Sequence, residues 1–187
     1  NWFTGGANGH IDEMARFVSP NTILLAQISE EERSSNPISK IDYEILEENY
    51  KILQQVTDIN GEPFKIIRVP SPNLNVPDYF TVIIVSDEWR ASGSLNMSSF
   101  SNDDTIKITK AVSYMKFFIS NEVVLSAEYW KEGMPESEKK KDEEVKKILE
   151  QLFPERKIIQ INPLAINRGG GGIHCATQQQ PRIKLGK

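Results

Sequence analysis

One pattern of apolar runs occurs twice in this chain, and it constrains the fold more than any other feature. Lys116-Phe117-Phe118 lies 100 positions after Arg16-Phe17-Val18, and the runs that follow both segments come in the same order. Two β-rich runs joined by a corner predict a hairpin, apolar residues at helical spacing predict a helix, and a short apolar run predicts a strand. The predicted elements are strands at 9–18 and 22–26, a helix at 41–56 and a strand at 64–69, then strands at 116–119 and 123–125, a helix at 142–153 and a strand at 157–161.

The repeat predicts two ββαβ modules, at residues 9–70 and 110–162, and therefore an α/β fold. A unit of this kind cannot bury its own apolar faces, so tandem copies usually pack around a common axis. Between the modules, residues 79–85 are a further strand candidate. The stretch at 86–105 is rich in Ser, Asn and Asp and is expected to be a loop or an insertion.

Composition and charge narrow the classes of function. The 187 residues are 39% hydrophobic and 26% charged, as is usual for a globular domain, and the net charge is −4. This charge argues against a nucleic-acid partner and weakly favours a small cationic one. No apolar run reaches the ~18–20 residues that cross a bilayer, so a membrane partner is not expected. The charged run at 136–144 is interpreted as the solvated start of a helix.

The cysteine count and the first residue bear on the cellular location and the processing of the chain. Its single cysteine cannot form an internal disulfide, so a cytoplasmic location is the expectation. The chain begins at Asn1 without a Met, which predicts a processed or partial polypeptide.

The two histidines and the cysteine lie in two glycine-framed segments, at 9–12 and 169–181. If the first segment is a strand, the alternation of side chains places His10 and Asp12 on one face. If the second is extended, His174 and Cys175 point to opposite faces. His10 is then the better proton-transfer partner for Cys175.

Residue types alone leave four interpretations open. Cys175 with a histidine suits covalent catalysis, and an adjacent carboxylate suits a cationic substrate. His10, Asp12, His174 and Cys175 are all possible zinc ligands, although the usual close spacing is absent. The four glycines at 169–172 are a weak candidate for a phosphate loop, because no Lys-Ser/Thr follows them. The fourth interpretation is a buried structural cysteine in a tight turn.

A resemblance favours the first interpretation. Gly169-Gly170-Gly171-Gly172-Ile173-His174-Cys175-Ala176-Thr177-Gln178-Gln179-Gln180-Pro181 resembles the C-terminal signature of the agmatine deiminase and bacterial-type peptidylarginine deiminase family. Asn8-Gly9-His10-Ile11-Asp12, followed by Arg16-Phe17, resembles the central His-x-Asp motif of that family. The intervening sequence also fits in order, at Leu24-Leu25-Ala26, Ser113-Tyr114 and Phe153-Pro154.

The resemblance implies a pentein-like, five-bladed pseudo-symmetric α/β propeller, of which this chain supplies about half. It implies hydrolysis of a small cationic guanidinium substrate, with agmatine first and arginine or peptidylarginine as alternatives, and with no metal or cofactor. Carried onto this sequence, Cys175 attacks the guanidinium carbon, His10 moves protons, and Asp12 and Gly172 bind the substrate. A non-catalytic fragment or subunit that keeps the fold is the rival interpretation.

Three departures from the family pattern stand out. Glu13 occupies a position where Asn is common, and Lys116 occupies one where the family usually has an Asn near the active site. The N-terminal half that supplies a further carboxylate is absent from this chain. We therefore expect the chain to pack against that missing half or another chain, or to form a homodimer.

Overall fold

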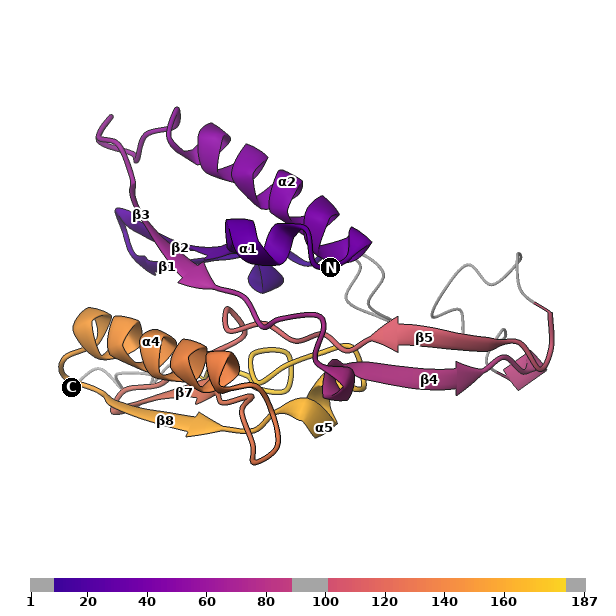
Figure 1. Ribbon diagram of the computed structural model, residues 1–187. Coiled ribbons are helices and arrows are strands. Elements are labelled where there is room, and N and C mark those ends of the chain that lie inside the picture. Colours follow the sequence, from indigo (N-terminus) through magenta and orange to yellow (C-terminus); the bar gives the residue numbers. More distant parts are fainter. Residues whose placement is uncertain (1–8, 89–100, 181–187) are drawn as a thin grey trace.

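The computed structural model describes residues 9–88 and 101–180, as two three-stranded sheets, a two-stranded hairpin and the helices that cover them (Figure 1). The middle of the expected insertion, residues 89–100, lies outside the described residues. Within the described ranges, every helix is too short or too polar to span a lipid bilayer.

The first sheet has the order β1-β2-β3. Strands β1 (Ala15–Ser19) and β2 (Thr22–Gln27) form the predicted antiparallel hairpin, and β3 (Lys65–Pro70) pairs parallel to β2. The short helix α1 (Glu30–Arg33) and the long helix α2 (Pro37–Leu53) provide the crossover. Helix α2 begins four residues before the predicted start, because Asn36 caps it by accepting a hydrogen bond from the Ser39 backbone N–H at 2.8 Å.

The predicted first strand is wrong over residues 9–14. Residues Ile11–Glu13 form a single turn of 3₁₀ helix, η1, and the strand begins only at Ala15. Gly9, with φ of 72°, precedes this turn in a conformation that glycine adopts easily. The alternation argument for His10 and Asp12 therefore does not apply, since these residues are not on a strand.

The second sheet has the order β6-β7-β8 with the same directions as the first. Its strands are β6 (Phe118–Ile119), β7 (Val123–Ala127) and β8 (Lys157–Ile161). The crossover helix α4 (Glu136–Leu152) connects β7 to β8, and the short helix α5 (Leu164–Asn167) follows β8. Helix α4 begins six residues before the predicted start. Apolar periodicity did not reveal this extension, because the first turns of the helix carry mostly charged side chains.

A hairpin that the sequence predicted only in part connects the two modules. After the 3₁₀ turn η2 (Pro77–Tyr79), the predicted strand β4 (Phe80–Ile84) pairs antiparallel with β5 (Thr105–Thr109). Strand β5 was missed because Thr-Ile-Lys-Ile-Thr follows directly on the polar stretch that was interpreted as a loop. This hairpin extends away from the two larger sheets (Figure 1).

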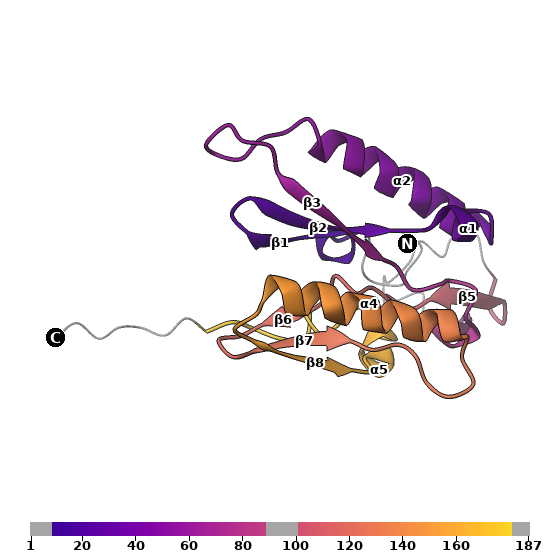
Figure 2. The ribbon, with the colours of Figure 1, turned by 60° about the vertical axis from the view of Figure 1, so that its left-hand side comes forward.

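Helix α4 packs between the two modules as well as on its own sheet. It contacts β3 of the first sheet together with β7 and β8 of the second, and Figure 2 shows it between the two sets of strands. A single core of buried apolar residues runs through this junction; its largest members are Tyr79, Tyr114, Tyr129, Phe117, Leu24, Leu25, Met115 and Leu149.

The charged start of α4 is not simply solvated, in contrast to the prediction. Glu138 is 0% exposed. Its carboxylate accepts hydrogen bonds from the Tyr79 hydroxyl at 2.7 Å and from the Asn73 backbone N–H at 3.1 Å. Lys141 donates to Glu32 of α1 at 2.6 Å and to the Ser71 carbonyl at 2.7 Å. These polar groups attach α4 to the first module.

Asp142, one turn further along α4, holds the connections of the second module. It accepts hydrogen bonds from the Tyr114 hydroxyl at 2.7 Å and from the backbone N–H groups of Tyr129 and Trp130 at 2.9 and 2.8 Å. Burial raises the pKa of the Asp142 carboxyl, although these hydrogen bonds oppose the increase. The segment that leads to β6 is thereby fixed against α4.

We predict that Glu138→Ala lowers the free energy of unfolding of the full-length protein by about 2–3 kcal/mol, because it leaves a partly buried N–H and a buried hydroxyl without their acceptor. Urea unfolding followed by circular dichroism measures the loss. Glu143→Ala, at an exposed position of the same helix, is the matched control and should change stability by less than about 0.5 kcal/mol. Equal effects of the two variants would contradict the role given to Glu138.

Candidate active site

An open cleft brings the two glycine-framed segments together. It has a volume of about 740 Å³, within the size range of small-molecule sites. Its walls come from η1 and β1, from β6 and from the terminal turn. The lining residues are His10, Ile11, Asp12, Arg16, Phe118, Ile119, His174, Cys175, Thr177, Gln178 and Gln179.

Asp12, His174 and Cys175 form a compact cluster on this cleft. His174 Nδ1 lies 2.8 Å from Asp12 Oδ2, and Cys175 Sγ lies 3.5 Å from the same oxygen. Asp12 is buried, whereas Cys175 is exposed and the His174 side chain is 43% exposed. The cluster therefore presents a thiol and an imidazole to the cleft, with a carboxylate behind them.

The terminal segment is a turn and not an extended chain, so the predicted separation of His174 and Cys175 onto opposite faces is wrong. The Ala176 N–H donates to the Gly172 carbonyl at 3.1 Å, and the Thr177 N–H donates to the His174 carbonyl at 3.2 Å. This turn directs both side chains toward Asp12. The exposed cysteine also excludes the interpretation of a buried structural thiol.

Two glycines allow this turn to form where it does. A Cβ atom on Gly171 would lie 3.1 Å from the Cys175 Cβ, closer than most such contacts. A Cβ atom on Gly172 would lie 2.6 Å from Lys116 Cδ, a separation that real structures do not show. Asn167, 1% exposed, fixes the same stretch by donating from Nδ2 to the Gly171 carbonyl at 2.8 Å and to the Ala111 carbonyl at 3.0 Å.

The segment 113–117 links η1 to the terminal turn. The Ser113 hydroxyl donates to the Glu13 carbonyl at 2.8 Å, and Lys116 Nζ lies 2.5 Å from Glu13 Oε1. The His174 N–H donates to the Lys116 carbonyl at 3.0 Å. Lys116 thus contacts the neighbour of Asp12 through its side chain and the neighbour of Cys175 through its backbone.

The same contacts explain two of the departures from the family pattern. Glu13 and Lys116 pair with each other, and their side chains are only 7% and 2% exposed. Lys116 does not line the cleft, and its ammonium group pairs with Glu13. The ammonium group therefore does not point at a cation bound in the cleft. Sequence reasoning treated the two positions separately, because 103 residues separate them.

The structure places the other predicted site residues less centrally. His10 is exposed and lines the cleft, but it lies outside the cluster of Asp12, His174 and Cys175. Gly172 is buried beneath Lys116 and is not a lining residue. The histidine that contacts Asp12 in this structure is therefore His174, while the predicted roles of His10 and Gly172 stay predictions.

Arg16, which in the sequence stands only as part of the segment around the His-x-Asp motif, also lines the cleft. Its guanidinium donates to the carbonyls of Met115 and Phe117 at 3.3 and 3.0 Å and stacks over the Phe117 ring at 4.7 Å. Burial lowers the pKa of Arg16, and the nearby charge of Asp12 opposes this. Arg16 fastens β1 to segment 113–117.

The electrostatics of the cluster favour an ionised Asp12. Burial by itself would raise the pKa of this carboxyl, but the hydrogen bond from His174 and the charge of Lys116 lower it below its ordinary value. Asp12 is therefore an anion at neutral pH, suited to hold a cation in the cleft.

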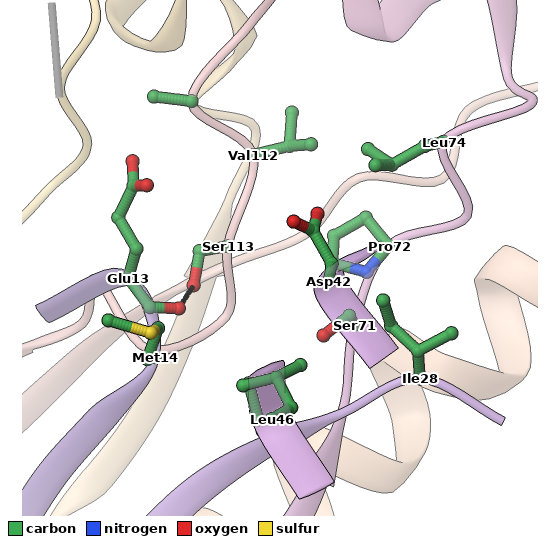
Figure 3. A pocket seen from close by; sticks show the side chains of 12 residues that line it. Glu13, Met14, Ile28, Asp42, Leu46, Ser71, Pro72, Leu74, Val112 and Ser113 are labelled. Atoms are coloured by element: carbon green, nitrogen blue, oxygen red, sulfur yellow. Dashed lines mark hydrogen bonds between the residues drawn. The ribbon is translucent and has the colours of Figure 1, made fainter. Parts of the chain in front are cut away.

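A second, much smaller cavity lies between α2, the end of β2 and residues 111–113 (Figure 3). Asp42, Pro72 and Leu74 gather at one end of it, and Glu13 and Ser113 lie at the other. Its volume of about 50 Å³ is room for very few water molecules, so a substrate-sized ligand does not fit. The cleft beside Cys175 is the candidate active site.

Comparisons with known proteins show which proteins this chain is similar to. The model of the Porphyromonas-type peptidyl-arginine deiminase family matches residues 4–181. Agmatine deiminase of Medicago truncatula is 32% identical over 182 residues, which cover 94% of this chain and 41% of that protein. Among solved structures, agmatine deiminase of Enterococcus faecalis has a TM-score of 0.63 at 24% identity, covering 94% of this chain and 41% of that one. This chain thus spans about two fifths of the length of these relatives.

The buried ion pair generates one prediction. Lys116→Met should destabilise the full-length protein by about 3–5 kcal/mol, because it leaves the Glu13 carboxylate buried without its partner. The double variant Lys116→Met, Glu13→Gln should recover most of this loss. Lys131→Met breaks an exposed pair with Asp78 and should cost less than about 1 kcal/mol. Urea unfolding of the four proteins, wild type included, tests the pair, and a double variant no more stable than Lys116→Met would contradict it.

The lowered pKa of Asp12 predicts how stability depends on pH. A carboxyl whose pKa is lower in the folded state than in the unfolded state stabilises the protein above its ordinary pKa of 3.8, and this contribution is lost as the pH falls through the folded-state pKa. Asp12→Asn should therefore be less stable than wild type at pH 7, and the difference should shrink below pH 3.8. Unfolding midpoints across this range measure it; a difference that grows in acid would contradict the assignment.

Proposed function

The chain belongs to the Porphyromonas-type peptidyl-arginine deiminase family, and we propose that it carries the nucleophilic part of an active site that hydrolyses a guanidinium group. The observation that carries this proposal is the position of Cys175 Sγ on the cleft, 3.5 Å from the Asp12 carboxylate. A nucleophile and an anion within one small site match the chemistry of a cationic, electrophilic carbon.

The proposed reaction has two halves. In the first, the Cys175 thiolate attacks the guanidinium carbon and forms a C–S bond. A carbon–nitrogen bond then breaks, and the departing nitrogen takes a proton from a histidine and leaves as ammonia. In the second half, water gives a proton to the histidine and attacks the thiouronium carbon. The C–S bond breaks and the thiolate returns. The remaining hydroxyl proton passes through solvent to the released ammonia, and a neutral ureido product leaves.

Asp12 is the proposed partner of the guanidinium nitrogens. His174 and Cys175 both approach its Oδ2, and we propose that Oδ1 accepts a hydrogen bond from a substrate N–H. The Glu13–Lys116 pair and the Ser113 hydroxyl hold η1 and thereby fix the direction of this carboxylate. Preorganisation of this kind reduces the cost of orienting the substrate.

We assign proton transfer to His10, which lines the same cleft and is free of the Asp12 contact. His174 is the rival for this role, because its Nδ1 is oriented by Asp12 at 2.8 Å. Gly172 is proposed to contribute its backbone to the substrate site; the close packing of Lys116 against its Cα explains why glycine is needed there.

Agmatine is the leading candidate substrate, with N-carbamoylputrescine and ammonia as products, since the Medicago truncatula relative is named an agmatine deiminase. Free arginine and peptidylarginine are the alternatives, and the family description supports the latter. We propose that the two ββαβ units are blades of a five-bladed propeller. The remaining blades, on a preceding segment or another chain, would supply a second carboxylate and the contacts to the substrate tail. A non-catalytic subunit with the same fold is the rival function.

The test is to incubate the full-length protein with agmatine, arginine and an arginine-containing peptide, and to measure ammonia and ureido product. We expect turnover of one guanidinium substrate and a loss of at least about 10³-fold in kcat for Cys175→Ala, because the covalent route is removed. Activity that survives in Cys175→Ala would contradict the nucleophile. Absence of turnover with all three substrates would favour the non-catalytic subunit.

The two histidines are separated by the matched variants His10→Ala and His174→Ala. If His10 moves the protons, His10→Ala should lower kcat by about 10²–10⁴-fold and remove one limb of the pH–rate profile. His174→Ala should then have a smaller effect on kcat and leave both limbs in place. The opposite result would assign proton transfer to His174.

A further inference from the structure

We propose that Asp12, His174 and Cys175 also form a binding site for a thiophilic divalent cation of the zinc class, which blocks the nucleophile reversibly. The three residues each offer one ligand atom, and these atoms all lie within 4.8 Å of one another. Thiolate, imidazole and carboxylate are the protein ligands that zinc takes, and this cluster contains the one cysteine of the chain and one of its two histidines.

The spacing of the ligand atoms suits a tetrahedral ion. With metal–ligand bonds of about 2.0–2.3 Å, adjacent ligand atoms of a tetrahedral site lie roughly 3.3–3.8 Å apart. Cys175 Sγ and Asp12 Oδ2 are already 3.5 Å apart. His174 Nδ1 and Asp12 Oδ2, at 2.8 Å, need to separate by about 0.5 Å as the ion replaces their hydrogen bond.

Residues outside the ligand set hold the ligands in place, and one side of the site is open to the cleft. The His174 N–H donates to the Lys116 carbonyl, and the Lys116 side chain pairs with Glu13 next to Asp12, so the ligands from both ends of the chain share one support. The exposed His174 and Cys175 face the cleft, where water can complete the coordination. Three protein ligands with an open position describe an accessible zinc site and not a closed structural one.

The local charges permit this binding. Bound to the ion, a carboxylate and a thiolate together offset the charge of a divalent cation, and the thiol proton is released on binding. Lys116 is neutralised by Glu13 at 2.5 Å. Arg16 donates to the carbonyls of Met115 and Phe117. Its positive charge also acts on Asp12 and Cys175 and opposes cation binding, which the two anionic ligands must offset.

The metal would oppose catalysis. Coordination uses the sulfur electron pair that attacks the guanidinium carbon, and it occupies the carboxylate proposed to hold the substrate. Zinc and substrate therefore compete for the same atoms. This inhibitory effect rests on the proposed function, whereas the existence of the metal site does not.

The experiment uses metal-free full-length protein, titrated with Zn²⁺ by calorimetry and with Co²⁺ by absorption spectroscopy. We expect one equivalent per chain, a thiolate-to-cobalt charge-transfer band, and loss of both with Cys175→Ser. His174→Ala and Asp12→Asn should weaken Zn²⁺ binding by roughly tenfold or more, whereas His10→Ala, the matched histidine control, should leave it within about twofold. Zinc binding that persists unchanged in Cys175→Ser, or that depends on His10 instead of His174, would overturn the proposal.

A second measurement uses the unmodified protein and does not depend on how the variants fold. Zn²⁺ should slow alkylation of Cys175 by iodoacetamide, and a chelator should restore the rate. An alkylation rate that is unaffected by Zn²⁺ would overturn the site. If Zn²⁺ protects the thiol but no guanidinium substrate is turned over without metal, the metal site is supported and the proposed function fails.

Discussion

The buried carboxylate of Glu138 is the interaction on which the arrangement of this chain depends. A charge at 0% exposure is tolerated because the Tyr79 hydroxyl and the Asn73 N–H donate to it, and both donors lie outside the second module. Lys141 adds bonds to α1 and to the end of β3. Helix α4 is therefore attached to both modules. Since Asp12 precedes the first sheet and Cys175 follows the second, this attachment is a condition for bringing them together.

A second junction, around Lys116, sets the site at finer scale. Lys116 forms an ion pair with Glu13, and its carbonyl accepts a hydrogen bond from the His174 N–H. Its side chain also fills the space that a Cβ atom at position 172 would occupy. The position that most seemed to conflict with a cationic substrate is thus a structural one. Glu13 and Lys116 both differ from the family pattern, and their opposite charges form one ion pair.

The cluster on the cleft combines two chemistries that are hard to separate. A thiol, an imidazole and a carboxylate within 4.8 Å suit nucleophilic attack on a cationic carbon, and the same donor atoms suit a soft divalent ion. Because Cys175 is exposed on the cleft, either a guanidinium substrate or a metal ion can reach it. Which of the two binds depends on their concentrations in solution. The chain also spans about two fifths of the length of these relatives, and we propose that residues outside it supply the opposite wall of the site.

The sequence by itself determined the order of most elements and the identity of the reactive groups. Apolar periodicity located β1, β2, α2, β3, β4, β7, α4 and β8, because each buries one face against a sheet or helix. Only the tertiary structure decided which groups meet. Whether Glu138 is solvated, and whether Lys116 faces the cleft or Glu13, both depend on partners 59 to 103 residues away. Local patterns carry no information about such distant partners, so the contact of His174 with Asp12 could not be predicted from them.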